Sequence, residues 1–314
     1  MKAILQVYGG EKYTLPPILA WSVTLTGGVP CDSFSLTCLY DAKMAPLLEK
    51  AYRLTLVDKE PLLEAVIDEY EILQDRRGRQ LSLSGRGLMA LLLDNESAAV
   101  EYIYPTLSEL LRRHVTPCGV NLASFSELRG KEPYAVRSGS SQWKALSGFT
   151  RYAGGFEPRM TPMGKLQAVP WRDDGTRLSI NVRTPISKLS WKEQRYGVYS
   201  EVLVIDKLKK TQQIIKNQEF LARGGNCRRV LYVPGRSSGT AMRYTGAYQI
   251  DQSKKHTRRL TAVLPGKFRA VPGQVLRMER NDIGITGDFY LEEWSSSCDE
   301  RGEQTTLTMR RLED

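Results

Sequence analysis

The chain has 314 residues, 41% of them hydrophobic and 25% charged, which is typical of a soluble globular protein with two or three domains. No run of about 18 apolar residues occurs, so the sequence predicts no membrane-spanning helix, and its start lacks the pattern of a signal peptide. Five scattered cysteines, no CxxC pair and only two histidines argue against a disulfide framework or a zinc site. We therefore expect a cytoplasmic origin and no cofactor.

The net charge of +10 is concentrated in the second half of the chain. Residues 1–169 hold 19 basic and 18 acidic residues, whereas residues 170–314 hold 26 and 17. The basic residues are scattered singly and in pairs, without the aromatic-basic module of a nucleic-acid reader. This pattern favours a solvated basic face over a dedicated nucleic-acid site, and both remain open.

Alternating apolar and polar residues predict strands through the first 85 residues. They cover several stretches between residues 3 and 40, and then 52–58, 64–75 and 79–85. The turn at residues 75–80 contains Gly78, which can adopt a positive φ. Five or six short strands at this spacing predict a small barrel or sandwich. Cys31 and Cys38 could meet across a hairpin there, although free thiols are favoured.

The next region has helical patterns. Residues 88–93 form a short apolar block, residues 105–119 begin with a proline, and residues 140–155 follow Ser140 or Ser141 as the cap. Residues 157–169 predict an irregular strand pair. This middle region therefore reads as α+β.

Strand patterns return after residue 176 and continue to the end of the chain, interrupted by a predicted helix at residues 240–256. Residues 211–225 fit a helix and a strand equally well. The two β regions could be two copies of one barrel.

The triplet Gly85-Arg86-Gly87 stands between the last early strand and the apolar block. It predicts a strand-to-helix corner, at which the arginine bridges neighbouring elements. A phosphate-gripping loop is the less favoured alternative.

No sequence motif for catalysis is present. There is no GxxxxGK[ST], GxSxG or HExxH motif. His114 lies late in a helix and His256 lies among cationic residues, so neither predicts a catalytic base. Adjacent acidic pairs such as Asp173-Asp174 point to opposite sides of a strand or to a turn, which argues against a two-carboxylate glycosidase site.

The order of several segments resembles that of baseplate hub proteins. These segments are SGRGLMALLLDNES, TLSELLRRHVTPCGV, SQWKALSGFTRYAGGFEPRMTPMGKL, VYSEVLVID and LPGKFRAVPGQVLRME, followed by the final FYLEE hairpin. The chain is similar over nearly its whole length to the late control gene D and tail-spike hub families of contractile phages and tailocins, in particular the prophage forms of Gram-positive bacteria.

The resemblance implies a mainly β, α+β fold with two tail-tube-like barrels. The first barrel would span residues 1–86, an α+β insert 87–169, and the second barrel, with an inserted helix, 170–314. In this family three subunits place six barrels in a ring, which adapts a hexameric tail tube to a trimeric spike and nucleates tube assembly. Gly85, Arg86 and Gly87 would then be an architectural corner, with Leu88, Leu91 and Leu92 anchoring the insert against the first barrel.

The partners implied are two further copies of the chain, the tail tube or a tube initiator, the central spike, other baseplate proteins and the tape measure. Nucleic acid would be present only as cargo in the lumen, and no membrane insertion is expected. The subunit would assemble in the bacterial cytoplasm and end in the virion or tailocin baseplate. Two alternatives of other classes are a cell-wall-degrading tail enzyme and a basic nucleic-acid-binding module.

Overall fold

Alternation of apolar and polar residues makes the first part of the chain a folded-over antiparallel sheet. The computed structural model describes residues 1–76, 78–194, 196–233, 237–254 and 257–312. The elements of this first β unit are β1 (Lys2–Val7), β2 (Lys12–Thr14), β3 (Ile18–Leu25), β4 (Ser33–Leu39), a 3₁₀ turn (Ala42–Met44), α1 (Ala45–Leu48), β5 (Ala51–Asp58), β6 (Glu60–Asp75) and β7 (Gly78–Gly87). Every second residue is buried in β4, in β3 from Trp21 onwards and in β7 from Leu81 onwards, as the predicted alternation requires.

The long strand β6 belongs to both layers of this unit. Its first half pairs with β5 and its second half with β7, and a bulge between Ile67 and Glu69 separates the two halves. A bulge bends a strand and increases its twist, so one continuous strand can turn from one layer into the other. The predicted strand at 64–75 is therefore confirmed, and it begins earlier, at Glu60.

The region that follows forms a separate α+β unit with its own core. Its elements are α2 (Ala90–Leu93), β8 (Glu96–Ser97), β9 (Val100–Tyr102), α3 (Leu107–Leu110), a π turn (Leu111–Val115), a 3₁₀ turn (Thr116–Cys118), β10 (Asn121–Phe125), β11 (Tyr134–Val136), β12 (Ser140–Ser141), α4 (Gln142–Gly154), β13 (Arg159–Met160) and β14 (Lys165–Ala168). The Ser141 hydroxyl accepts from the Lys144 N–H at 3.2 Å and caps α4, as predicted. The predicted strand pair is β13 with β14.

The last part of the chain forms a second β unit. Its elements are β15 (Arg177–Asn181), β16 (Lys188–Glu193), β20 (Arg258–Pro265), β21 (Val275–Arg280), a 3₁₀ turn (Asn281–Ile283), β22 (Ile285–Asp299) and β23 (Gly302–Arg311). Inserted between β16 and β20 is a small layer of β17 (Glu201–Asp206), β18 (Thr211–Lys216), α5 (Gln218–Ala222), β19 (Arg228–Tyr232) and α6 (Gly239–Lys254). The predicted helix is α6, and the ambiguous segment is a strand followed by a short helix.

The two β units share one network of strand pairs. In the first unit β3 pairs with β4, β4 with β7, β7 with β6 and β6 with β5; in the second, β16 pairs with β20, β20 with β23, β23 with β22 and β22 with β21. When the β6–β7 hairpin is superposed on the β22–β23 hairpin, Asp75 corresponds to Asp299. The bulge of β6 then corresponds to the bulge of β22 between Leu291 and Glu293. The outermost strands differ, because β1 runs antiparallel to β5 whereas β15 runs parallel to β21.

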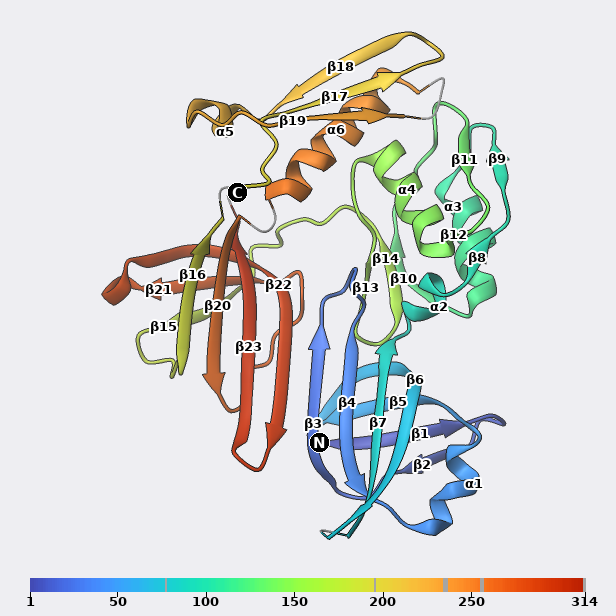
Figure 1. The fold of residues 1–314 in the computed structure, drawn as a ribbon, viewed down its shortest axis with the longest axis vertical. Coiled ribbons are helices and arrows are strands. Elements are labelled where there is room, and N and C mark those ends of the chain that lie inside the picture. Colours follow the sequence, from blue (N-terminus) through green and yellow to red (C-terminus); the bar gives the residue numbers. More distant parts are fainter. Residues whose placement is uncertain (77, 195, 234–236, 255–256, 313–314) are drawn as a thin grey trace.

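The two units are joined into one continuous sheet. Strand β22 pairs with β3, and the described strands form a 13-stranded sheet in which β16, β20, β23, β22, β3, β4, β7 and β6 lie side by side (Figure 1). Buried residues of both units form a single hydrophobic cluster behind this sheet. The mainly β, α+β fold with two related β units is thus confirmed, with 48% of residues in strands and 20% in helices.

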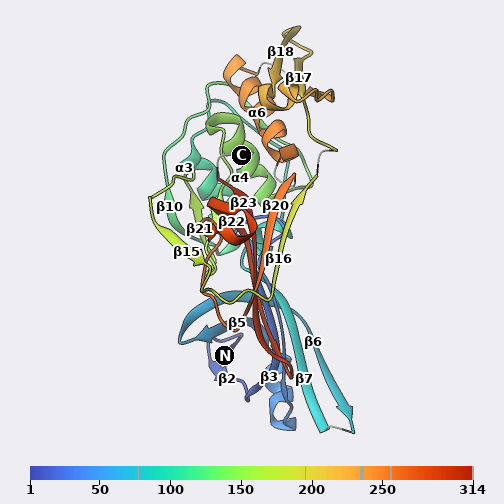
Figure 2. The same cartoon turned by 90° about the vertical axis from the view of Figure 1, so that its left-hand side faces the viewer.

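The α+β unit and the inserted layer lie at the same end of the molecule. Figures 1 and 2 show β17, β18 and α6 beyond one end of the joined sheet, with the β6–β7 hairpin projecting at the opposite end. Helix α6 packs on β17 through Val202, Val204, Met242 and Ile250. The broad face of the long sheet therefore lies between an end that carries the α+β unit and the inserted layer and an end formed by a β-hairpin.

Candidate assembly surfaces

The joint between the two β units is an ordinary antiparallel strand pair with a buried core side. Trp294 of β22 lies opposite Leu25 of β3, and Cys298 lies opposite Trp21. The Trp294 indole N–H also donates to the Phe268 carbonyl at 2.7 Å. Because its polar atom is satisfied, the indole ring is buried at the joint without an unpaired donor.

The opposite face of the joined sheet carries short hydroxyl side chains. Ser22 lies between Ser35 and Ser297 on neighbouring strands, and Thr24 lies between Ser33 and Ser295. We call this surface the hydroxyl face; it consists of Ser22, Thr24, Ser33, Ser35, Thr37, Ser82, Ser84, Ser190, Thr261, Ser295, Ser297, Thr306 and Thr308.

The outer strands have a different solvent side. There, β5, β15 and β21 carry Arg53, Arg177 and Arg277. Serine is not a strand-favouring residue, so strand propensity does not explain its repetition across the hydroxyl face. The hydroxyl face is instead a set of uncharged polar side chains, all but Thr308 at least partly exposed, in a protein of net charge +10.

Charged residues border the hydroxyl face with opposite signs at its two edges. Glu69 and Glu71 of β6 lie on this face at one edge, opposite Ser84 and Ser82. Lys188 and Lys192 of β16 lie on it at the other edge, opposite Val263 and Arg259. The hydroxyl residues therefore lie between an acidic margin on β6 and a basic margin on β16.

The triplet Gly85-Arg86-Gly87 lies within β7, so the predicted corner comes two residues later, at Leu88 and Met89. The two glycines permit close packing, not a tight turn. A Cβ on Gly85 would lie 2.0 Å from the Val66 carbonyl oxygen, and one on Gly87 would lie 3.0 Å from Cβ of Asp32. Any side chain at Gly85 would therefore clash with the neighbouring strand.

Arg86 bridges two acidic side chains from different elements. Its guanidinium donates to both carboxylate oxygens of Asp68 on β6, at 2.7 and 2.9 Å, and to both of Asp94 at the end of α2, at 2.9 and 2.8 Å. These hydrogen bonds lower the pKa of Asp94. These bonds use four of the five guanidinium N–H groups, and the two carboxylates balance its charge, which disfavours the phosphate-gripping alternative.

The three leucines of the predicted anchor lie at different places. Leu92 is fully buried in the core of the α+β unit, and Leu91 packs against that core. Leu88 is buried against the turn of β13 and β14, since a Cβ on Gly164 would lie 2.4 Å from its Cδ1. An anchoring role for the set stays a prediction.

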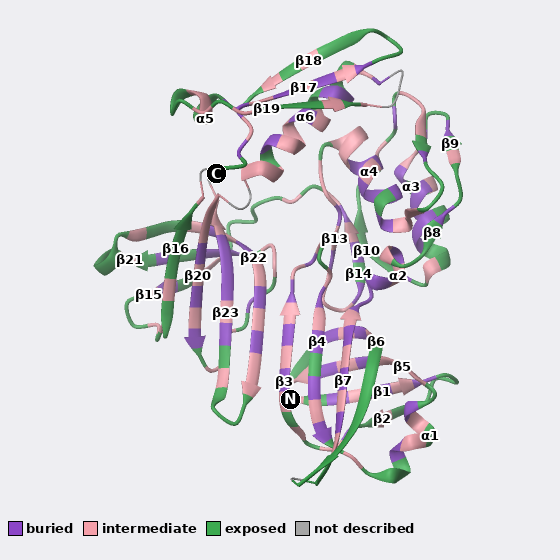
Figure 3. Cartoon of the chain, viewed as in Figure 1, coloured by how far each residue is buried: buried purple, intermediate pink, exposed green. Residues whose placement is uncertain are grey.

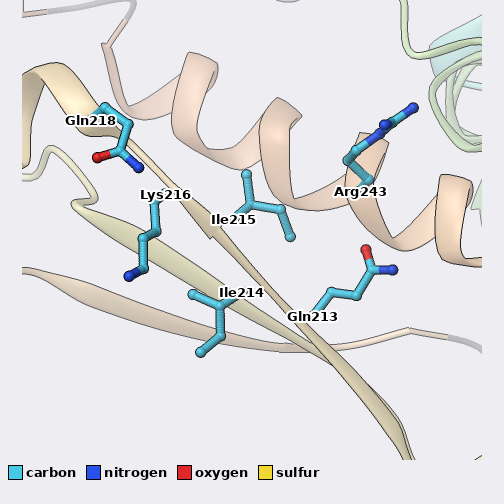
Figure 4. Close-up of a pocket in the computed structure, with 6 residues that line it drawn as sticks. All are labelled: Gln213, Ile214, Ile215, Lys216, Gln218 and Arg243. Carbon is cyan, nitrogen blue, oxygen red and sulfur yellow. The ribbon is translucent and has the colours of Figure 1, made fainter.

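The inserted layer holds most of the basic excess. Residues 198–257 contain 11 basic and 4 acidic residues, a net charge of +7 out of the +9 of the second half. Ile215 and Gln213 point towards α6, whereas Ile214 points to the opposite side of the sheet (Figure 4). A shallow pocket there is lined by Gln213, Ile214, Ile215, Lys216, Gln218 and Arg243. It contains neither an acid nor a histidine.

His114 has a structural position. It is buried, with Nε2 at 2.8 Å from the Tyr102 hydroxyl and Nδ1 at 2.5 Å from Oε1 of Gln142. Burial lowers its pKa, so the ring is held neutral between these two partners. His256 lies outside the described residues.

The remaining sequence candidates for chemistry are also accounted for by local structure. Asp173 forms an ion pair with Arg177 at 2.6 Å, and Asp174 accepts from the Thr176 N–H at 2.8 Å, so this acidic pair shapes a turn. Among the residues that the structure describes, no cluster of three or more His, Cys, Asp or Glu could hold a metal ion. Cys31 and Cys38 are free thiols. Over the same residues, no helix has the length and apolar character needed to cross a membrane.

Comparison with known proteins relates this geometry to phage tails. No protein-family model and no curated protein matches the sequence. A tail protein from Neisseria meningitidis MC58 superposes with a TM-score of 0.76 and 18% identity, covering 99% of this chain and 96% of that one. The 43 kDa tail protein of prophage MuSo2 from Shewanella oneidensis gives 0.75 and 15%, covering 99% and 98%.

A third solved structure widens the comparison. The E. coli c3393 protein, a type VI secretion component described as structurally similar to the T4 phage tail proteins gp27 and gp5, gives a TM-score of 0.59 at 11% identity. It covers 98% of this chain and 76% of that one. At identities this low the superpositions establish the fold alone. This chain has the fold of these phage and prophage tail proteins, which at that level confirms the resemblance expected from the sequence.

Proposed function

We propose that the chain is a structural, non-enzymatic baseplate hub subunit of a contractile phage tail, tailocin or related injection particle. Three copies form a homotrimer that adapts a hexameric tail tube to a trimeric spike and nucleates tube assembly. The observation that carries this proposal is the duplicated strand network, joined edge to edge in one sheet. Its support from known structures lies in the phage tail neighbours.

The duplication gives this role a physical basis. A closed ring requires each unit to present matching edges to its two neighbours. One chain with two equivalent β units supplies two of the six positions in a ring. Three chains therefore have pseudo-six-fold symmetry where the β units contact the tube. The α+β unit and the inserted layer occur once per chain, and they give the other end true three-fold symmetry. We assign residues 1–86, 87–169 and 170–314 to the first barrel, the insert and the second barrel.

The hydroxyl face suits the inner wall of such a ring. Side chains of Ser and Thr keep a hydrated surface without a net charge, so neither a polyanion nor a polypeptide would be retained by it. The proposed partners are the tube or its initiator, the spike, other baseplate proteins and the tape measure, with nucleic acid only in transit. Assembly would take place in the bacterial cytoplasm and the final location would be the particle baseplate.

Electron microscopy of the source particle tests this proposal. With the subunit located by a tag or antibody, we expect three-fold density at the junction of tube and spike. Light scattering of the purified chain, alone and with its spike, should give the mass of three copies. A subunit located on the sheath or the tail fibres, or a strictly monomeric chain in both conditions, would exclude the hub function.

A further inference from the structure

Two strand edges of the joined sheet are open, and they are the counterparts of the two that meet inside the chain. In the superposition of the two units, β6 corresponds to β22 and β16 corresponds to β3. Within the described residues, the second half of β6 pairs only with β7, and β16 pairs only with β20. The joint inside the chain uses β22 and β3, so the same joint between copies would use β6 and β16.

Apolar side chains at these open edges are exposed, and pairing with another strand would cover them. Tyr70 and Ile72 of β6 are 44% and 43% exposed, although the residues opposite them, Leu83 and Leu81, are fully buried. On β16, Trp191 is 40% exposed. Figure 3 shows that most of this strand is exposed. At the internal joint the counterpart residues are covered, with Trp294 at 5% and Val23 at 0% exposure.

The charges of the two edges are complementary. Residues 68–75 of β6 contain four acidic residues and no basic one, whereas β16 contains Lys188 and Lys192 with one acid, Glu193. An exposed edge with unpaired backbone groups and apolar side chains is a template for pairing with another chain. Opposite charges favour the correct partner and suppress pairing of an edge with its own copy.

We infer that β6 of one copy pairs antiparallel with β16 of the next copy, in the register of the internal joint. Transferring that register places Glu71 opposite Lys192 and Ile72 opposite Trp191. The alignment follows from the strand pairs. Trp21 lies opposite Leu36, which lies opposite Leu83, and in the second unit Leu189 lies opposite Ala262, which lies opposite Leu307. Because Leu83 corresponds to Leu307, Trp21 corresponds to Leu189. The salt pair lies on the hydroxyl face and the apolar pair lies on the core side. This inference rests on the proposed trimer and specifies its contact.

Directly opposite residues in an antiparallel pair have Cβ atoms roughly 4.5–5.5 Å apart, within reach of a disulfide after a small adjustment. The double variant Ile72→Cys/Trp191→Cys should therefore give covalently linked trimers on mild oxidation. The matched control Ile72→Cys/Leu189→Cys moves one cysteine two residues along the same side of β16 and should crosslink at least several-fold less. Wild-type chain, with its five native cysteines, sets the background.

Charge reversal gives an independent readout. Glu71→Lys and Lys192→Glu should each raise the concentration at which half of the chain is trimeric by roughly tenfold, and the double reversal should restore it. Glu101→Lys, on the α+β unit, should have no effect.

The outcomes separate the contact from the function. A chain that is trimeric by light scattering, but crosslinks in the control pair and not in the Ile72/Trp191 pair, would overturn the inferred register and leave the hub function standing. A chain that never trimerises, with or without its spike, would overturn both.

Discussion

The two β units have the same strand network, but they connect one pair of strands in different ways. Between β3 and β4 the chain makes a short loop, residues 26–32, in which the buried Asp32 carboxylate accepts from the N–H groups of Thr26 and Gly27 at 2.7 and 3.0 Å. Between the counterpart strands β16 and β20 it makes the inserted layer. A sheet tolerates such an insertion because the connection leaves at the end of the strands and the added loop-closure entropy grows slowly with length.

A second difference lies at the edges. The first unit has β3 covered and β6 open, whereas the second has β22 covered and β16 open. Equivalent side chains are therefore core residues in one unit and surface residues in the other. Substitutions at equivalent positions should differ in effect for that reason alone, which makes the comparison testable.

The largest difference is expected at Trp294 and its counterpart Tyr70. Trp294→Ala removes a buried indole and its hydrogen bond to Phe268, so the free energy of unfolding should fall by about 3–5 kcal/mol. Tyr70→Ala should cost the isolated chain less than about 0.5 kcal/mol, because the ring is exposed there. Urea unfolding of dilute, monomeric protein measures both.

For Tyr70→Ala, the effect on trimer formation should be larger than the effect on the free energy of unfolding. Tyr70→Ala should weaken self-association while leaving the monomer intact. If both substitutions destabilised the isolated chain equally, the equivalence of the open and covered edges would be wrong.

Gly85 and its counterpart Met309 provide a second matched pair. Gly85→Ala should destabilise by about 1–3 kcal/mol, because the added methyl group meets the Val66 carbonyl at 2.0 Å and the Phe34 ring at 2.8 Å. Met309→Ala should also destabilise, but through the cavity left by a fully buried side chain. Thermal unfolding of the Gly85→Ala variant measures whether the strands accept the added methyl group. We expect a lower melting temperature, and an unchanged one would contradict the close approach of β6 and β7.

The strands of both β units were predictable from the sequence because their alternation repeats at the period of a strand. The cap Ser141 of α4 was equally readable, since a serine before an amphipathic run has a specific hydrogen-bonding role. The corner at Gly85-Arg86-Gly87 was placed too early, because the sequence does not show whether a glycine serves a turn or a close contact. Only the position of Val66 and Asp32 across the sheet distinguishes these two uses.

The assembly surfaces were less predictable. The hydroxyl face depends on the register of seven strands, some of them far apart in the sequence, so its serines looked like ordinary polar positions of separate strands. The open edges required the strand order, which alternation cannot supply. A recoverable signal existed in the acidic segment DEYEILQD at 68–75, whose exposed apolar residues fit no simple amphipathic strand.

The basic inserted layer allows a test of the nucleic-acid alternative. On the side of its sheet away from α6, Lys216 and Arg228 lie on either side of Glu201, and Lys207 lies over the Tyr232 ring. If DNA binding is only generic charge attraction, the triple variant Lys207→Gln/Lys216→Gln/Arg228→Gln should weaken it by roughly tenfold at 50 mM salt. Wild-type binding should already be weak at physiological salt. Tight binding there, in a filter-binding assay, would favour a nucleic-acid function.

The smallest expected difference concerns a carboxylate at the same place on the two long strands, Asp288 on β22 and Glu64 on β6. Asp288 accepts from Arg277 at 2.8 Å and from Arg177 at 2.7 Å, and these bonds lower its pKa from 3.8 to about 2. Glu64 forms an ion pair with Arg53 at the longer distance of 3.3 Å. Because the folded-state pKa of Asp288 is depressed, its contribution is present above pH 4 and is lost as the pH falls through 2.

Asp288→Asn should therefore lower the free energy of unfolding by about 1 kcal/mol at pH 7, since this ion-pair network is partly open to solvent. The loss should shrink between pH 4 and pH 2, where the wild-type carboxylate takes up its proton. Glu64→Gln should cost less at pH 7, because a single pair at this distance contributes little. Urea unfolding of both variants at pH 7, 3 and 2 and constant ionic strength measures the effect. A loss for Asp288→Asn that persisted unchanged at pH 2 would mean that the side chain acts through packing, and that the two arginines do not stabilise the second unit through its charge.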